Sequence, residues 1–345
     1  MKKQILISII IPVYNGSKYL HRCLDALARS SYRSFEIIVV DDNSTDNSAE
    51  IGQQKGATVL HMPRRSGPAA ARNYGAQKAR GDILFFVDAD VVVQQDTVAR
   101  VAADFLKYPD IAAVFGSYDD DPAEKNFISQ FKNLYHHFVH QQSPAEAVTF
   151  WAGCGAVRRE IFYAAGGFDL VRYYNPSIED VELGYRLHRA GHRILLDKDL
   201  QVKHLKLWNL RGLLLADIFY RAVPWSYLFI EHRHIINSLN FRISDRISTG
   251  FVGLTIALFP FSIYRPQALY AVVLLLAAIL FLNRRLYLFF IKRRGLKFAA
   301  LAFPMQALYY FYSGATFTLC LSSYVFLGKR SPGVGRKVEV YGQIN

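Results

Sequence analysis

The stretch GPAAARNYGAQKARGDILFFVDADV, residues 67–91, decides the fold. Its first part predicts a helix around residues 68–79, and the uncharged run ILFFV (83–87) predicts a strand that is covered on both faces. The acids of Asp88-Ala89-Asp90 follow that strand directly. Ligands of open α/β sheets bind beyond the carboxyl ends of the strands, so these acids mark a candidate site.

Three further buried strands precede this stretch, and helical segments separate them. The strands are ILISIIIPV (5–13), FEIIVV (35–40) and ATVLH (57–61). Ser17 is a plausible N-cap for the helix that follows the first strand. The first run is too short for a signal peptide and no small-residue cleavage site follows it. The alternation predicts a mostly parallel, Rossmann-like α/β sheet flanked by helices.

Acidic residues follow two of these strands. Asp41 and Asp42 end the second, and Asp88 and Asp90 follow the fourth. Parallel strands bring their carboxyl ends to one edge, where two acidic clusters repel unless a cation lies between them. Carboxylates are ligands that Mg²⁺ and Mn²⁺ prefer, and such ions commonly bridge one or two of them to a diphosphate.

The composition excludes several classes of protein. The chain has 345 residues, of which 52% are hydrophobic and 20% charged, which is too apolar for a disordered chain. Three widely spaced cysteines without a CxxC exclude a disulfide scaffold and argue against structural zinc. The net charge of +13 suits an anionic partner, such as nucleic acid, anionic lipid or a phosphate-bearing substrate.

Three uncharged runs lie near the C-terminus, at 247–264, 266–282 and 298–327. A bilayer-spanning helix needs about 20 apolar residues, with about 17 as the lower limit. The runs predict a transmembrane region over 247–328 with two to four segments, against the alternative of buried helices in a soluble protein. Pro304 and Gly314 interrupt the third run, which is either one span or a re-entrant hairpin.

The loop between the second and third runs is basic and has no acid. By the positive-inside rule it lies in the cytoplasm, and two preceding spans place residues 1–240 there too. The tail at 329–345 is also basic, which a single third span does not explain. The basic residues of the loop are Arg284, Arg285, Lys292, Arg293, Arg294 and Lys297.

The segment 203–246 is basic, aromatic and striped with leucine at helical spacing. This pattern is typical of a helix in the membrane interface, and the alternative is a helix packed on the preceding domain. No nucleic-acid partner is expected, because no recognised nucleic-acid module is present. Four domains are predicted. Residues 1–204 form an α/β domain and residues 205–246 an interface segment. Residues 247–328 form a membrane region and residues 329–345 a basic tail.

Five stretches in fixed order together resemble a family 2 glycosyltransferase with the GT-A fold. They are SIIIPVYNGSKYLHRCLDAL (8–27), EIIVVDDNSTDNS (36–48), the stretch 67–91 quoted above, GCGAVRREIFYAAGGFD (153–169) and IEDVELGYRLHRAGHRI (178–194). The resemblance covers residues 5–204 and implies an enzyme that transfers a sugar from a nucleotide-sugar, usually a UDP-sugar.

The resemblance also implies roles for single residues. Asp180 would be the general base of an inverting transfer, and Glu179 would support it or the acceptor. Gly153-Cys154-Gly155 would form a small-residue loop near the acceptor or the sugar, and Cys154 would not act as a nucleophile.

The nucleotide-sugar would contact Pro12, Tyr14, Asp41, Asp42, Arg72, Asp88 and Ala89. Mn²⁺ or Mg²⁺ would be ligated by Asp90 and Asp88, with His204 as a further candidate that could equally be an ordinary core or surface histidine.

Several alternatives stay open. Processive members of the family carry Gln-x-x-Arg-Trp, and residues 221–225 (RAVPW) are only a loose echo, which favours transfer of a single sugar. A lipid-linked acceptor at the cytoplasmic face of the inner membrane is the favoured hypothesis. A catalytically silent membrane scaffold is the alternative from another class. A sugar nucleotidyltransferase is disfavoured, because PVYNGS (12–17) is not a Gly-rich basic loop. The sequence leaves the sugar and the oligomeric state open.

Overall fold

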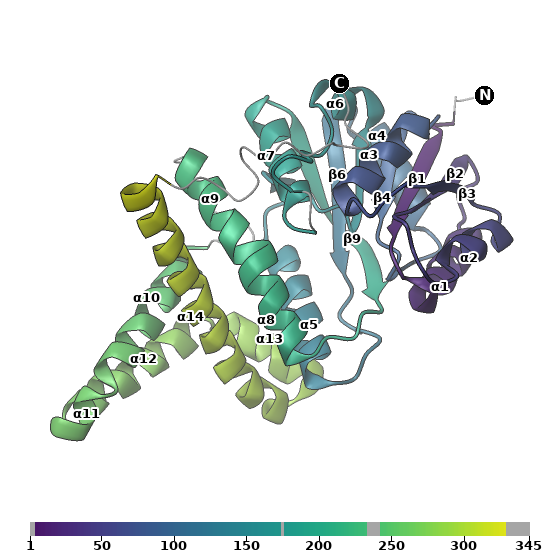
Figure 1. Ribbon diagram of the computed structural model, residues 1–345. Helices are drawn as coiled ribbons and strands as arrows, with labels where there is room; N and C mark the ends of the chain where they lie inside the picture. The colour runs from purple at the N-terminus through teal and green to yellow at the C-terminus, as the bar shows by residue number, and fades with distance from the viewer. Residues whose placement is uncertain (1–3, 174–175, 233–241, 329–345) are drawn as a thin grey trace. The chain divides into compact units, whose positions relative to one another are not determined.

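The computed structural model describes residues 4–173, 176–232 and 242–328, which form two compact units (Figure 1). The sheet unit comprises residues 4–125 and 140–207, and the helical unit comprises residues 126–139 and 208–328. The basic tail expected at 329–345 lies outside the described residues.

The first half of the sheet is parallel, as predicted. Its strand order is β3-β2-β1-β4, and every neighbouring pair runs in the same direction. The connecting helices lie where the periodicity placed them. The elements are β1 (Ile7–Val13), α1 (Ser17–Ala28), β2 (Phe35–Asp41), α2 (Ser48–Gln54), β3 (Thr58–His61), α3 (Pro68–Lys78) and β4 (Ile83–Val87).

The predicted Ser17 cap is wrong. Helix α1 begins at Ser17 itself, and its N-cap residue is Gly16, which has no side chain. The Ser17 N–H instead donates to Asp46 Oδ2 at 3.0 Å, so a distant carboxylate satisfies this helix end.

The second half of the sheet is mixed, and the prediction of a mostly parallel sheet is wrong. The strand order continues β4-β8-β6-β9-β5, and β7 pairs with β9. The pairs β4–β8, β6–β8, β5–β9 and β7–β9 are antiparallel, whereas β6–β9 is parallel. The elements are β5 (Val91–Val93), α4 (Thr97–Lys107), β6 (Ile111–Tyr118), β7 (Glu146–Ala147), β8 (Cys154–Arg158), α6 (Arg159–Ala164), α7 (Glu179–Arg189) and β9 (Arg193–His204).

The small-residue loop expected at 153–155 is also corrected, because β8 begins at Cys154 and inserts between β4 and β6. A Cβ on Gly155 would lie 2.2 Å from the Trp151 carbonyl oxygen. The glycine therefore serves close packing inside the sheet.

Two apolar cores cover the two faces of the sheet. On one face, Leu20 and Leu24 of α1 pack with Val101 and Phe105 of α4. On the other face, α3, α6 and α7 contribute Ala69–Ala71, Phe162 and Leu183. Each fully buried large apolar side chain stabilises the fold by about 1.5–3 kcal/mol, so both faces hold the strand ends in place.

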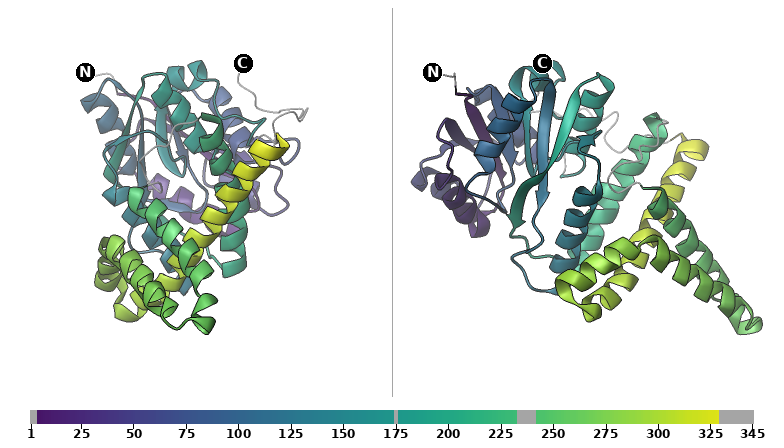
Figure 2. Two further views of the ribbon diagram at one scale, coloured as in Figure 1. Left: turned by 90° about the vertical axis from the view of Figure 1, so that its left-hand side faces the viewer. Right: turned by 180° about the vertical axis from the view of Figure 1, so that it is seen from behind.

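The helical unit contains helices from two distant parts of the chain (Figure 2). Its core joins Phe131 and Leu134 of α5 to Leu286 and Phe290 of α13 and to Ala302 of α14. The elements are α5 (Phe127–Gln142), which continues into the sheet unit, α8 (Leu210–Asp217), the π-helical turn η1 (Ile218–Ala222), α9 (Val223–His232), α10 (Ile243–Leu258), α11 (Phe261–Tyr264), α12 (Ala268–Leu282), α13 (Arg284–Arg294) and α14 (Leu296–Leu327).

A buried charge cluster ties four of these elements together. Asp217 of α8 accepts from Lys132 Nζ at 2.7 Å, from Arg221 Nη1 at 2.8 Å and from the Tyr312 hydroxyl at 2.8 Å. Because Asp217 is only 5% exposed, these donors compensate the cost of burying its charge.

The uncharged C-terminal runs fold as helices of unequal length. The third run is one continuous helix, α14, with Pro304 inside it, so the re-entrant hairpin is wrong. Helices α10 and α12 have 16 and 15 residues, short of the length a straight span needs. Within the described residues, one helix, Leu210–Glu231, is long and apolar enough to cross a membrane. The pair α12–α13 is bent by 69° and would be a second candidate if the two helices form one span.

Candidate active site

Strand β1 continues past the end of its pairing with β4, at the point of the sheet where ligands of α/β folds occupy the crevice beyond the strand ends. Strand β1 pairs with β2 as far as Val13, but its pairing with β4 stops at Ile10. Pro12, which has no N–H, lies beyond that last pair, so no ladder hydrogen bond to β4 is lost there. The strand order reverses at β1, and this is the place where α/β sheets bind ligands.

Side chains cross-link the two loops on one side of the crevice. The Thr45 N–H donates to Asn15 Oδ1 at 2.8 Å, and the Asn15 N–H donates to Ser44 Oγ at 2.9 Å. Asn15 has a φ of 48°, in the left-handed region that asparagine tolerates. These contacts fix the backbone around Tyr14, which the sequence analysis assigned to the nucleotide.

A cation covers one face of the Tyr14 ring. Its side chain is 39% exposed, and the Arg65 guanidinium lies 4.0 Å from the centre of its ring. This cation–π contact holds Arg65 at the rim of the crevice. The sequence analysis missed Arg65, although the basic pair Arg64-Arg65 just before Gly67 marked the position.

Asp41 and Asp42 are anchored in backbone hydrogen bonds. Asp42 accepts from the N–H groups of Ser66 and Gly67 at 2.7 and 2.8 Å, just before α3 begins. Burial raises the pKa of Asp42, although these two hydrogen bonds and Arg65 oppose the shift. Asp41 accepts from the Ser44 N–H at 3.2 Å. Both carboxylates therefore shape the crevice loops.

Arg72 joins the two acidic motifs. Its Nη2 donates to Asp88 Oδ1 at 2.7 Å, and its Nη1 donates to Glu179 Oε1 at 2.8 Å. The Arg72 side chain is only 6% exposed, so the bridge is shielded from water. One guanidinium thus connects α3, the end of β4 and the start of α7. The Glu179 carboxylate is paired with Arg72 in this bridge.

Asp180 lies one residue further on, in the first turn of α7. Its Oδ2 accepts from the Ala152 N–H at 2.9 Å, and its Oδ1 accepts from the Val181 N–H at 2.8 Å. Burial, and then the nearby charge of Glu179, raise the pKa of Asp180 to about 7. A carboxylate with such a pKa can take up a proton near neutral pH. The Ala152 N–H is a second group that the sequence analysis missed.

Asp90 and His204 form the other polar pair of the site. The β5–β9 ladder places Val91 opposite His204, and His204 Nε2 lies 3.5 Å from Asp90 Oδ2. The Tyr118 ring stacks on the imidazole with centroids 4.2 Å apart. Burial raises the pKa of Asp88, whereas the charge of His204 lowers the pKa of Asp90 against the effect of burial.

These side chains leave a partly open acidic surface. Asp88 and Asp90 are 30% and 22% exposed at the side chain, with Ala89 half-buried between them. Among the described residues, no group of three or more His, Cys, Asp or Glu side chains is assembled to hold a metal ion by itself. Asp88 pairs with Arg72, whereas Asp90 lies next to His204.

Cys154 is a free, buried cysteine. It is fully buried at the start of β8, and burial raises the pKa of its thiol. A thiol that stays protonated is a poor nucleophile.

Comparisons with known proteins bear on the sheet unit first. Residues 8–166 match the sequence family described as Glycosyl transferase family 2. Glycosyltransferase GlyG of Streptococcus pneumoniae serotype 4 is 36% identical over 128 residues, which are 35% of this chain and 42% of that protein. The chain spans less than half the length of the curated relatives that it matches.

Solved structures show the same fold over most of the chain. S. aureus TarS 1–349, in complex with UDP-GlcNAc, has a TM-score of 0.52 at 18% identity and covers 94% of this chain and 93% of its own. The mannosyltransferase PcManGT from Pyrobaculum calidifontis, in complex with GDP-Man and Mn²⁺, has a TM-score of 0.50 at 18% identity, with 95% and 89% covered. The sheet unit is therefore a GT-A-like mixed α/β sheet with flanking helices.

Proposed function

We propose that this chain, whose residues 8–166 carry a glycosyl transferase family 2 domain, is an inverting, metal-dependent glycosyltransferase that moves one sugar from a nucleotide-sugar to an acceptor. The Arg72 bridge carries the proposal. It ties Asp88, on the donor side, to Glu179, the neighbour of the candidate base Asp180. Donor and acceptor chemistry then share one rigid scaffold.

The donor would lie in the crevice between β1 and β4. Tyr14 offers a face on which a nucleobase can stack, and Arg65 offers a cation for the phosphates. The complexes of TarS with UDP-GlcNAc and of PcManGT with GDP-Man support a nucleotide-sugar as the donor class. The family resemblance favours a UDP-sugar.

A divalent cation, Mn²⁺ or Mg²⁺, would be held by Asp90, with Asp88 and His204 as further ligands. Such ions are commonly bound by one or two carboxylates together with substrate phosphates, so the small donor set fits an ion that arrives with the diphosphate. The Mn²⁺ in the PcManGT complex supports this assignment. When bound, the ion neutralises charge on the leaving diphosphate.

Asp180 would act on the acceptor. Its carboxylate takes the proton of the acceptor hydroxyl as the oxygen attacks the anomeric carbon, and the nucleoside diphosphate leaves with the electron pair of the broken bond. No covalent enzyme intermediate is needed, in keeping with the buried Cys154. An acceptor phosphate is already ionised and would need Asp180 less.

The acceptor would be lipid-linked, at the cytoplasmic face of the cell membrane. Among the described residues, only Tyr14, Leu106, Val171 and Leu207 of the large exposed apolar side chains lie in the sheet unit, and the others lie in the helical unit. Patches of this kind are typical of surfaces that contact a membrane or another protein. The apolar helix Leu210–Glu231 supports the same proposal.

Thermal unfolding of the full chain in mild detergent tests the donor site. UDP, GDP and CDP are each added with Mn²⁺, Mg²⁺ or EDTA. A ligand at 100 times its Kd adds about 2.7 kcal/mol, which visibly raises the Tm. We expect a metal-dependent shift with one nucleotide that is lost in Asp90→Ala.

Asp110→Ala is the matched control, because it removes a carboxylate whose partner is the surface residue Arg193. The shift must survive in this variant. A folded parent chain that shifts with none of the nucleotides would favour the silent-scaffold hypothesis instead.

A further inference from the structure

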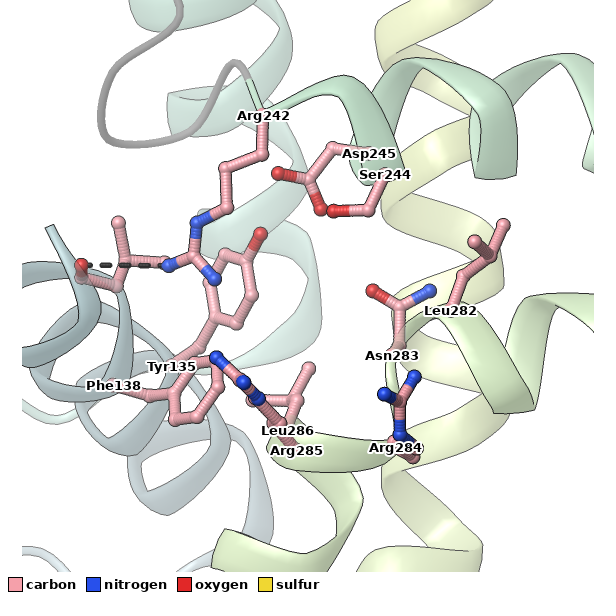
Figure 3. A pocket seen from close by; sticks show the side chains of 11 residues that line it. Tyr135, Phe138, Arg242, Ser244, Asp245, Leu282, Asn283, Arg284, Arg285 and Leu286 are labelled. Carbon is pink, nitrogen blue, oxygen red and sulfur yellow. Dashed lines mark hydrogen bonds between the residues drawn. The ribbon is translucent and has the colours of Figure 1, made fainter.

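The helical unit contains a cavity of about 280 Å³ that no residue assigned to sugar transfer lines (Figure 3). Aromatic and aliphatic side chains, including Tyr135, Phe138 and Leu286, form part of its wall. Pockets for drug-sized ligands measure about 300–1,000 Å³, so this cavity suits a headgroup with a short stem. It belongs to the helical unit alone.

Three arginines line the cavity, and the charge of one of them, Arg242, acts on the nearby carboxylate of Asp245. Arg242, Arg284 and Arg285 form no salt bridge with any acid in the part of the chain that the structure describes. Arg242 donates to the Val139 carbonyl oxygen at 3.4 Å, and Arg284 donates to the Phe281 carbonyl oxygen at 3.1 Å. Each guanidinium has five N–H donors, and those of the exposed Arg284 and Arg285 can exchange water for a ligand.

The one acid in the wall is already engaged. Asp245 Oδ1 accepts from the Tyr310 hydroxyl at 2.9 Å, and that hydroxyl also lies 2.8 Å from Asn283 Oδ1. Asn283 Nδ2 donates to Ser248 Oγ at 2.9 Å. Three cations against one such carboxylate leave the cavity with a net positive charge.

The start of α13 adds to that charge. The helix begins at Arg284, has no acid in its first turn and places two arginines there. The N-terminus of a helix carries a partial positive charge, so basic side chains at this place repel it. A bound anion would relieve the repulsion.

We infer that this cavity binds a phosphate monoester. Arg242, Arg284 and Arg285 would hold the phosphate oxygens through charge-assisted hydrogen bonds, a geometry for which guanidinium groups are well suited. The aromatic wall beside them would take the apolar stem of an amphiphile. The site is additional to the donor and acceptor chemistry proposed above, and it requires neither.

Native mass spectrometry of the full chain, released from detergent, tests the inference. The probes are dihexanoyl phosphatidic acid, dihexanoyl phosphatidylcholine, which has the same tails and no net charge, and inorganic phosphate. We expect one saturable phosphatidic acid adduct and none with phosphatidylcholine. Arg242→Gln and Arg285→Gln should each weaken binding at least tenfold, the loss of one charged hydrogen bond.

Lys292→Gln is the matched control, because it removes the same charge from an exposed position of the same helix, outside the cavity. It should bind as the parent does. Equal weakening in Lys292→Gln and Arg285→Gln, or equal binding of both lipids, would overturn the inference. Equal Tm values for these two exposed-site variants show that folding is intact.

The phosphate arm identifies the source of the ligand. Displacement of the lipid by inorganic phosphate at a similar concentration assigns the site to the phosphate group alone. Binding at least about tenfold tighter for phosphatidic acid assigns it to a lipid headgroup. The binding experiment contains no nucleotide-sugar and no metal. A negative result therefore does not bear on the proposed transferase activity, and a negative result in the nucleotide experiment does not bear on this cavity.

Discussion

At the scale of single residues, the neighbours Glu179 and Asp180 have opposite environments. Glu179 accepts a charged hydrogen bond from Arg72, whereas Asp180 accepts only backbone N–H groups. The pKa of Asp180 is accordingly raised to about 7, by burial first and by the charge of Glu179 second. Adjacent carboxylates in such different environments are typical of sites where one group positions and the other transfers a proton, here Glu179 and Asp180.

The pKa of Asp180 predicts the pH dependence of the reaction. A general base must be ionised, and with a pKa of about 7 the carboxylate is mostly protonated below about pH 6. For a hydroxyl acceptor, kcat should rise about tenfold per pH unit below that pKa and level off above it. Measured kcat profiles check this, and a profile flat from about pH 5 to 8 would contradict the role.

Arg72→Ala should destabilise the chain markedly. It leaves Glu179 and Asp88 without their cation, and breaking a buried pair costs about 3–5 kcal/mol. Urea unfolding measures the loss. Arg80→Ala is the control, because the Arg80 side chain is 78% exposed in its pair with Glu36, and it should cost less than about 1 kcal/mol. Similar losses in the two variants would refute the structural role.

The sequence marks the candidate carboxylates more clearly than the groups that contact them. Asp88, Asp90 and Asp180 stand out because strand ends and motifs mark them. The Ala152 N–H could not be foreseen, because a backbone donor leaves no trace in residue type. The Arg72 bridge could not be foreseen either, since it joins residues 107 positions apart.

At the scale of elements, helix α7 approaches a neighbouring backbone closely. A Cβ on Gly184 would lie 2.1 Å from the Phe150 backbone nitrogen. Glycine at this position lets the helix reach the segment that contains Ala152, whose N–H binds Asp180. The position of the candidate base therefore depends on a glycine one turn away from it.

Gly184→Ala should lower kcat more than it raises KM. Overpacking of this kind costs about 1–3 kcal/mol and would shift α7 away from the 149–152 backbone. Steady-state kinetics and urea unfolding measure the two effects. His188→Ala, at an exposed position of the same helix, should leave both unchanged. Full activity in Gly184→Ala would show that the close approach has no catalytic role.

Strand direction was the part of the fold that the sequence did not predict. A short apolar run looks the same whether it runs parallel or antiparallel to its neighbour, and β8 is only five residues long with Cys154 and Gly155 at its start. The first four strands were predictable because helices of ordinary length connect them. The connection from β6 to β8 is longer and passes through α5, so its length did not indicate the direction of β8.

At the scale of the whole molecule, a helix in the middle of the chain packs in the helical unit. Phe131 and Leu134 of α5 contact a core completed by α13 and α14. The predicted boundary at residue 204 assigns α5 to the first domain, whereas its core partners lie in the region predicted to be transmembrane. The sequence analysis made no prediction for residues 127–142, and residue type alone does not show which core a helix joins.

A chain that ends after residue 207 should therefore be poorly soluble. It would retain the apolar face of α5 without the helices that cover it. Sedimentation after expression measures the soluble fraction. The triple variant Phe131→Gln, Leu134→Gln, Phe138→Gln of the same truncated chain should recover solubility. A soluble, monodisperse chain without these substitutions would contradict the expectation.

The split origin of that core also has a consequence for biosynthesis. About 150 residues separate Phe131 from Leu286, and a ribosome that adds about 5–20 residues per second needs about 8–30 s to bridge them. The strands of the sheet unit emerge and can pair during this interval, while α5 still waits for its partners. The nascent chain thus exposes an aromatic helix face in every round of synthesis, and a chaperone or a lipid surface that shields it would govern the yield of folded protein.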